Sequence, residues 1–111
     1  TSAMIQTAWR NDPSAMPLGD ILAMATENAG RGLGLNIGKV EEGYEADLLI
    51  IDTDNYSFLS PGSFLANLIY SAHSDCVDSV ICQGRFLMKN RVVPCEREIL
   101  DSARKILKKI L

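Results

Sequence analysis

The side chains that could carry out chemistry in this sequence are few. One histidine, His73, and three cysteines, Cys76, Cys82 and Cys95, are the residues best suited to bind a transition metal or to act as a nucleophile. Their spacing forms no Cys-x-x-Cys pair, His-x-His motif or His-Glu-x-x-His motif, and no Ser/His/Asp set can be assigned. One imidazole with scattered carboxylates falls short of the ligand number of a zinc site. The sequence therefore predicts no catalytic, cofactor-binding or metal-binding residue in this chain.

Each of these residues has a structural interpretation that fits its surroundings. His73 follows a predicted helix and precedes a predicted strand, so we interpret it as a loop or helix-end histidine. The odd number of cysteines favours buried, reduced thiols over disulfides, and Cys82 lies in an apolar strand pattern where cysteine acts as a small hydrophobic residue. Asp47 stands at the start of a predicted strand, where its carboxylate can accept hydrogen bonds from nearby backbone N–H groups.

Composition narrows the classes of partner. The 111 residues suffice for one domain, and 47% apolar with 23% charged residues is typical of a folded, soluble protein. A net charge of −3 supplies no basic patch for nucleic acid or for an anionic membrane surface. No apolar run reaches the ~20 residues of a membrane-spanning helix, and the first four residues lack a signal-peptide pattern. We therefore expect a cytoplasmic protein.

The first third of the chain has a helical pattern. Apolar residues share one helical stripe over residues 2–10, and a chain that opens inside a helix without an initiator Met suggests that upstream residues are lost or belong elsewhere. A second helix should begin near Pro17, which suits the first helical position. Polar residues interrupt the pattern at 26–28, and a helical turn over 29–33 should end at Gly34 as a left-handed cap. Two short helices and one bent helix are both compatible with this pattern.

From Gly38 the apolar period changes to that of strands. Residues 46–52 have an unbroken apolar centre that is typical of a strand covered on both faces, so something larger must pack on it. A loop over 54–62 and a helix over 63–72 should follow. The pattern of residues 77–83 and 86–90 predicts a hairpin, with the turn at Gly84-Arg85.

The last segment carries the clearest helical pattern. Residues 96–111 place one apolar stripe on a helix, with acidic residues early and basic residues late, which suits the helix dipole. Asp101 and Lys105 are spaced for an ion pair. Two heptads are too short for a convincing coiled coil, so we expect the stripe to dock on a larger fold. The stripe consists of Ile99, Leu100, Ala103, Ile106, Leu107, Ile110 and Leu111.

Three stretches of this sequence resemble the amidohydrolase superfamily. Residues 25–35 (ATENAGRGLGL) resemble A-T-x-N-x-A-x-x-L-G-L, and residues 38–48 (GKVEEGYEADL) resemble G-x-[IVL]-x-x-G-x-x-A-D-[LIF]. Residues 67–85 resemble L-V-Y-x-A-x-x-x-D-V-x-x-V-[IV]-V-x-G-[RK], a form typical of the branch with chlorohydrolases, guanine deaminases and S-adenosylhomocysteine deaminases. The departures are Gly30 in place of Ala, Tyr44-Glu45 in place of a Lys-x pair, and Cys82 in place of an apolar strand residue.

The resemblance implies an α+β fold with three parts. Residues 1–36 would be the last helices of a (β/α)₈ barrel, and residues 37–93 a β-rich segment of the small composite β-sandwich with a helix near 63–72. Residues 94–111 would be a terminal amphipathic helix. The family's divalent metal, zinc or iron, is implied for the parent enzyme, with all of its ligands upstream of this chain, so no ligand is assigned here.

The leading hypothesis is therefore a C-terminal fragment of a metal-dependent hydrolase that cleaves a C–N or C–Cl bond of a heterocycle. The fragment would be inactive alone and would brace the missing barrel portion, its expected partner. Without that barrel, its exposed apolar helices would favour self-association. A non-catalytic scaffold or interaction module and a small-molecule binding domain are the alternatives. Amino-purines, amino-pyrimidines and halogenated triazines all stay open as substrates.

Overall fold

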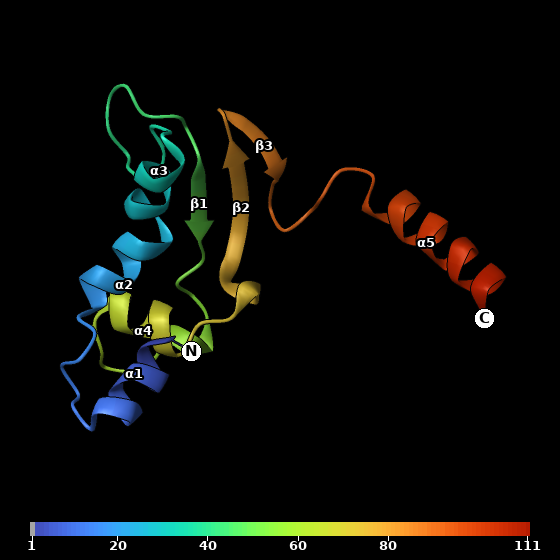
Figure 1. Cartoon of the computed structure of the whole chain (residues 1–111). Coiled ribbons are helices and arrows are strands. Elements are labelled where there is room, and N and C mark those ends of the chain that lie inside the picture. Colours follow the sequence, from blue (N-terminus) through green and yellow to red (C-terminus); the bar gives the residue numbers. More distant parts are fainter. Residues whose placement is uncertain (1) are drawn as a thin grey trace.

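The computed structural model describes residues 2–111 as helices gathered on one side of a small antiparallel sheet, with a last helix set apart on the other side (Figure 1). This arrangement confirms the predicted mixture of helices and a small sheet. The helices are α1 (Ser2–Arg10), α2 (Leu18–Ala25), α3 (Glu27–Leu33), α4 (Phe64–Tyr70) and α5 (Glu96–Ile110). The strands are β1 (Leu48–Ile51), β2 (Val77–Cys82) and β3 (Arg85–Met88).

Helices α2 and α3 are two separate helices that meet at Thr26. The Thr26 hydroxyl donates a 2.7 Å hydrogen bond to the carbonyl of Leu22, and its backbone (φ −127°, ψ −96°) leaves the helical region. Pro17 precedes α2 as its cap, with an extended ψ of 141°, one position earlier than predicted. Gly34 ends α3 in the left-handed conformation (φ 69°), as predicted.

The sheet has the strand order β1-β2-β3, and both pairs are antiparallel. The turn between β2 and β3 lies at Gln83-Gly84, where both residues have positive φ (49° and 75°). The prediction of Gly84-Arg85 was wrong by one residue, because a two-residue turn of this hand needs positive φ at both central positions. A second tight turn, which was not predicted, lies at Asn90-Arg91 (φ 49° and 64°).

The segment between β1 and β2 is fixed by caps. The predicted helix over 63–72 is α4, and the Ser63 hydroxyl accepts a 3.2 Å hydrogen bond from the amide of Ala66 at its start. The predicted loop contains a 3₁₀ turn over Tyr56–Phe58, capped by the side chain of Asn55. The rings of Phe58 and Phe64 stack with centroids 5.5 Å apart, which joins this turn to α4.

Burial shows that the described residues do not enclose a core of their own. Over residues 2–111, Ala3 and Cys76 are the apolar residues that are buried. The accessible surface is 8756 Å², against roughly 6,100 Å² expected for a compact monomer of this mass. The radius of gyration is 17.8 Å, against roughly 13 Å expected for this length. Much apolar surface that a folded domain would bury is therefore open.

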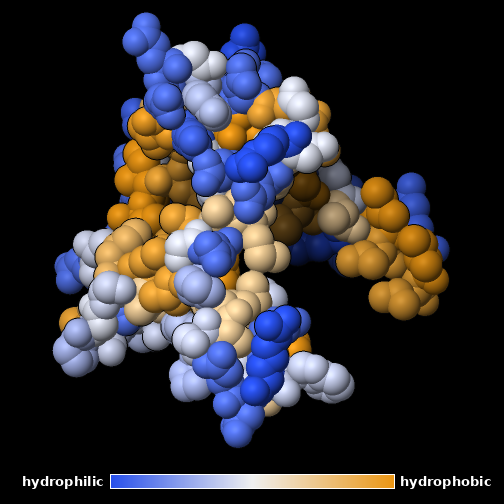
Figure 2. Space-filling view, turned by 60° about the vertical axis from the view of Figure 1, so that its left-hand side comes forward, coloured by the Kyte–Doolittle hydropathy of each residue, from blue (hydrophilic) through white to orange (hydrophobic). Residues whose placement is uncertain are grey.

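Helix α5 and strand β1 show this openness most clearly. No residue of α5 is buried, and Ile99 and Ile106 on its stripe are 61% and 59% exposed. Apolar side chains gather over α5 and over the helical side of the body in Figure 2. Asp101 pairs with Arg104 at 3.0 Å, not with Lys105 as predicted. Leu49 of β1 is 62% exposed, so these residues do not themselves cover both faces of the strand.

None of the helices within residues 2–111 has both the length and the apolar character needed to cross a bilayer.

Candidate functional site

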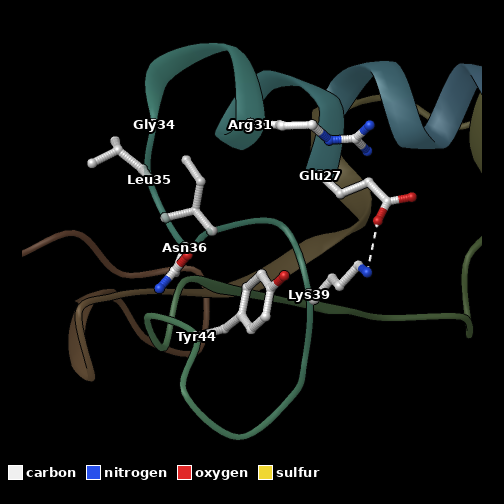
Figure 3. A pocket seen from close by; sticks show the side chains of 8 residues that line it. Glu27, Arg31, Gly34, Leu35, Asn36, Lys39 and Tyr44 are labelled. Atoms are coloured by element: carbon white, nitrogen blue, oxygen red, sulfur yellow. Dashed lines mark ion pairs between the residues drawn. The ribbon is translucent and has the colours of Figure 1, made fainter.

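A polar pocket lies where α3 meets the linker that leads to β1. It has a volume of about 330 Å³ and is drawn in Figure 3. The Lys39 ammonium lies 3.0 Å from the Glu27 carboxylate and 5.9 Å from the centre of the Tyr44 ring. The pocket is lined by Glu27, Arg31, Gly34, Leu35, Asn36, Ile37, Lys39 and Tyr44.

Close backbone contacts shape this joint between helix and linker. Gly38 has φ 90°, and a Cβ at this position would stand 2.4 Å from the carbonyl carbon of Thr26. Gly30 is buried, and a Cβ there would stand 2.7 Å from the carbonyl oxygen of Ile37. The linker can reach α3 because both positions lack a side chain. Gly30, where the resemblance has Ala, is thus explained by the path of residue 37 past the helix.

Glu27 and Lys39 form an ion pair in the pocket, and Arg31 adds one further positive charge. The hydrogen bond from Lys39, supported by its positive charge, lowers the pKa of the Glu27 carboxyl, and the same contact raises the pKa of Lys39. Both groups therefore stay ionised near neutral pH, where neither is suited to exchange a proton with a substrate. Arg31 donates a 2.9 Å hydrogen bond to the side chain of Asn28. We interpret this pocket as a structural joint that fixes α3 against the linker.

A second, apolar depression of about 320 Å³ lies on the sheet. At its edge, the Asp47 carboxylate accepts a 2.8 Å hydrogen bond from the amide of Gln83, which ties the start of β1 to the β2-β3 turn. This contact confirms the structural role predicted for Asp47. Partial desolvation raises the pKa of the Cys82 thiol, and the negative charge of Asp47 adds to the rise. The depression is lined by Asp47, Leu48, Leu49, Val80, Ile81, Cys82 and Leu87.

His73 and the three cysteines, the residues best suited to chemistry, do not form a common site in the structure. His73 is exposed and precedes the 3₁₀ turn Ser74–Cys76 without capping it through its side chain. Cys76 is buried, as predicted, but Cys82 and Cys95 are exposed, so the prediction of buried thiols was wrong for these two. The reason for Cys82 is that the described residues leave that part of the sheet uncovered. Cys95 precedes α5 in the left-handed conformation (φ 61°).

The family's divalent metal can be tested against these side chains. Within residues 2–111, no three His, Cys, Asp or Glu side chains come together in a group able to hold a metal ion. A tetrahedral zinc site needs three or four such ligands at bonding distance. The described residues therefore do not fit the metal.

Sequence reasoning missed a polar cluster at the end of the sheet. Arg91 donates a 2.8 Å hydrogen bond to Asp52, which follows β1, and a second one to the backbone carbonyl of Asp75. The amide of Arg91 also bonds the carbonyl of Asp78 at 2.7 Å. A residue other than glycine at positive φ is uncommon, and these contacts hold it in place. The Asn90-Arg91 pair between short apolar runs was the signal that could have found this turn.

The fold and the joint together define a mixed helix-and-sheet unit whose polar contacts are structural and whose apolar faces are open. The model of the amidohydrolase family matches residues 1–87. The chain therefore belongs to the amidohydrolase family, which confirms the resemblance found in its motifs.

Individual relatives and a solved structure give this membership more detail. The chain is 42% identical, over its whole length and 26% of the relative's, to a protein of Aquifex aeolicus called 5-methylthioadenosine/S-adenosylhomocysteine deaminase. It is 36% identical, over 94% of its length and 23% of the relative's, to a 5'-deoxyadenosine deaminase of Methanospirillum hungatei. The crystal structure of a Xanthomonas campestris adenosine deaminase with bound zinc matches 98% of this chain and 26% of its own, with a TM-score of 0.87 and 27% identity. The chain thus spans about a quarter of the length of the relatives it matches.

Proposed function

We propose that this chain is the C-terminal part of an adenosine-type deaminase, in which it braces a catalytic centre supplied by other segments of the enzyme. The observation that carries the proposal is the match of the entire chain to about a quarter of a deaminase at 42% identity. No group of three His, Cys, Asp or Glu side chains within residues 2–111 is placed to hold a metal ion. The divalent metal of the parent, zinc or iron, would then be held elsewhere.

The proposed reaction is the hydrolysis of a C–N bond on an aminated heterocycle. Water adds to the carbon that bears the amino group, the C–N bond breaks, and ammonia leaves while the carbon becomes a carbonyl. Aminated purine nucleosides are the favoured substrates, because the relatives named above carry the names of deaminases of such compounds. No residue of this chain is assigned a catalytic role.

The division of the chain follows from this role. Residues 1–36 would close the barrel, residues 37–93 would belong to the composite β-domain, and residues 94–111 would form the terminal helix. The joint around Gly38 lies at the first boundary, where the Glu27–Lys39 ion pair holds α3 against the linker. A rigid joint here would keep barrel and β-domain in a fixed relation, which an active site built on barrel loops requires.

A chimera tests this function. The portion of the Aquifex aeolicus relative that matches this chain is replaced by the 111 residues, and ammonia release from 5-methylthioadenosine and S-adenosylhomocysteine is measured. We expect activity within about tenfold of the unaltered relative, since remote packing changes cost little when the fold is kept. A folded chimera that takes up metal but releases no ammonia from either substrate contradicts the proposal.

The exposed stripe of α5 favours one other candidate, a non-catalytic interaction module that binds a separate protein. The chimera distinguishes these two functions. An interaction module that acts independently of the enzyme would not be expected to restore deaminase activity to the chimera.

A further inference from the structure

We propose that Arg91 is a clamp that fixes the place where the chain leaves the sheet toward α5. The arm that follows Arg91, residues 92–95, connects the sheet to α5, which Figure 1 shows set apart from the sheet. The clamp forms within the described residues, so it goes beyond the proposed function and is independent of the reaction that the parent enzyme carries out.

The turn at Asn90-Arg91 reverses the chain after β3. Lys89 and Val92 pair across this turn, with amide-to-carbonyl hydrogen bonds of 3.0 Å and 2.9 Å. Asn90 and Arg91 both have positive φ (49° and 64°). Glycine adopts this conformation without a steric cost, whereas arginine does not. An arginine in this position therefore indicates contacts of its own that offset the cost.

The contacts of Arg91 reach three other parts of the chain. Its guanidinium donates a 2.8 Å hydrogen bond to the carboxylate of Asp52, which follows β1, and another to the carbonyl of Asp75, which precedes β2. Its amide donates a 2.7 Å hydrogen bond to the carbonyl of Asp78 in β2. An exposed ion pair alone contributes little, but a planar guanidinium that donates to two partners at once is fixed in orientation.

The neighbouring residue holds the turn from the sheet side. The amide of Asn90 donates a 3.1 Å hydrogen bond to the hydroxyl of Ser79, which is only 2% exposed. That hydroxyl donates in turn to the carboxylate of Asp78 at 2.8 Å. Loss of the Arg91 side chain should therefore loosen the turn and the arm while β2 keeps its place.

The arm beyond the turn has only local hydrogen bonds among the described residues. The amide of Glu96 bonds the carbonyl of Val93 at 3.3 Å, and the amide of Ile99 bonds the carbonyl of Cys95 at 3.0 Å. No residue of α5 is buried. Within residues 2–111, the turn that Arg91 holds is thus the last tie between the sheet and α5.

The test measures hydrogen exchange in the chimera and compares the amides of residues 89–96 with those of β2. Arg91→Gln removes the guanidinium but keeps a side chain that tolerates positive φ, as Gln83 does (φ 49°). Arg91→Gly removes the side chain together with the steric cost. The matched control is Arg85→Gln, because Arg85 is exposed and takes part in none of the ion pairs of the described residues.

The expected result is a local loss of protection. Both Arg91 variants should lose at least about tenfold of the exchange protection over residues 89–96, while β2 keeps its protection and Arg85→Gln changes neither segment. Asp52→Asn removes the ion pair but leaves the contact of Arg91 with Asp75, so its loss should be smaller. Combined with Arg91→Gln it should add nothing further, because both substitutions break the same contact. If the Arg91 variants do not fold, Asp52→Asn decides by the same comparison.

Three results would overturn the clamp. Full protection in Arg91→Gly would mean that position 91 requires only positive φ and no guanidinium. Equal losses in β2 and in residues 89–96 would mean that Arg91 stabilises the whole chain and not the exit of the arm. A loss in Arg85→Gln as large as that in Arg91→Gln would reduce the effect to one of net charge.

Discussion

Helices α3 and α5 obtain their positions in opposite ways. Helix α3 has only seven residues, two of them glycines, yet the linker passes directly over it at Gly30 and Gly38 and is tied to it by the Glu27–Lys39 ion pair. Helix α5 has 15 residues and an uninterrupted apolar stripe, yet none of its residues is buried. A strong local pattern therefore does not by itself give a helix its place in the fold.

The comparison of α3 with α5 separates contacts formed within these residues from surfaces that stay exposed. The joint at α3 is built from residues 26–44, and all of its partners lie in these 111 residues. The stripe of α5 and Leu49 of β1, by contrast, stay exposed among the described residues.

Substitution of Gly38 should have the largest effect. Gly38→Ala places a Cβ 2.4 Å from the backbone of Thr26 at φ 90°, so we expect the chimera to lose about 2–4 kcal/mol of unfolding free energy. Denaturant unfolding measures this loss. The control is Gly43→Ala, which has φ 88° but open space around it and should cost only about 1 kcal/mol. Equal losses would mean that the close approach to α3 does not matter.

Two glycines within α3 should respond with opposite signs. Gly30→Ala places a Cβ 2.7 Å from the carbonyl oxygen of Ile37 and should destabilise the chimera by about 1–2 kcal/mol. Gly32→Ala meets nothing within 4 Å and should stabilise it by about 0.5–1 kcal/mol through helix propensity. Thermal unfolding of both variants checks this. If both were stabilising, the linker would not be packed on the helix.

Thiol labelling sharpens the contrast between closed and open surfaces. In the 111-residue chain alone, Cys82 and Cys95 should react with a thiol reagent and buried Cys76 should not. Because the pKa of Cys82 is raised, its thiolate fraction near pH 8 is small, so it should react more slowly than a free peptide thiol. In the chimera we expect Cys82 to slow by at least about tenfold more as the sheet becomes covered. An unchanged Cys82 rate would leave the sheet open in the whole enzyme.

The pH dependence of the joint should be the smallest effect. The lowered pKa of Glu27 means that its contribution is present above its ordinary value of 4.5 and is lost as the pH falls through the lowered pKa. The raised pKa of Lys39 means that its contribution is present below 10.5 and is lost as the pH rises through the raised pKa. Glu27→Gln should flatten the acid limb of stability against pH in the chimera, and Glu42→Gln in the same linker should leave it unchanged.

The sequence predicted the helices and strands better than the contacts and the exposure of their residues. Periodicity placed α1, α4 and α5 within a few residues because each carries a full apolar stripe. The turn at Asn90-Arg91 escaped, because Arg91 holds its positive φ through contacts with Asp52 and Asp75, which are distant in sequence. The exposure of Cys82 escaped for a related reason, since an apolar strand pattern does not say which segment covers it.

Motifs predicted the family but not the joint. Gly38 and Gly43, the two glycines of the second motif, both have positive φ. The Glu27–Lys39 ion pair could not be predicted, because it forms only once the linker doubles back onto α3. Local patterns specify helices and turns, whereas contacts between segments depend on a chain path that they do not encode.

The most direct measurement compares metal content and ammonia release for the purified 111-residue chain and for the chimera, side by side. Our account gives the chain alone no stoichiometric zinc or iron and no deamination, and it gives the chimera both. Stoichiometric metal in the isolated chain, together with ammonia release from an aminated purine nucleoside, would contradict it.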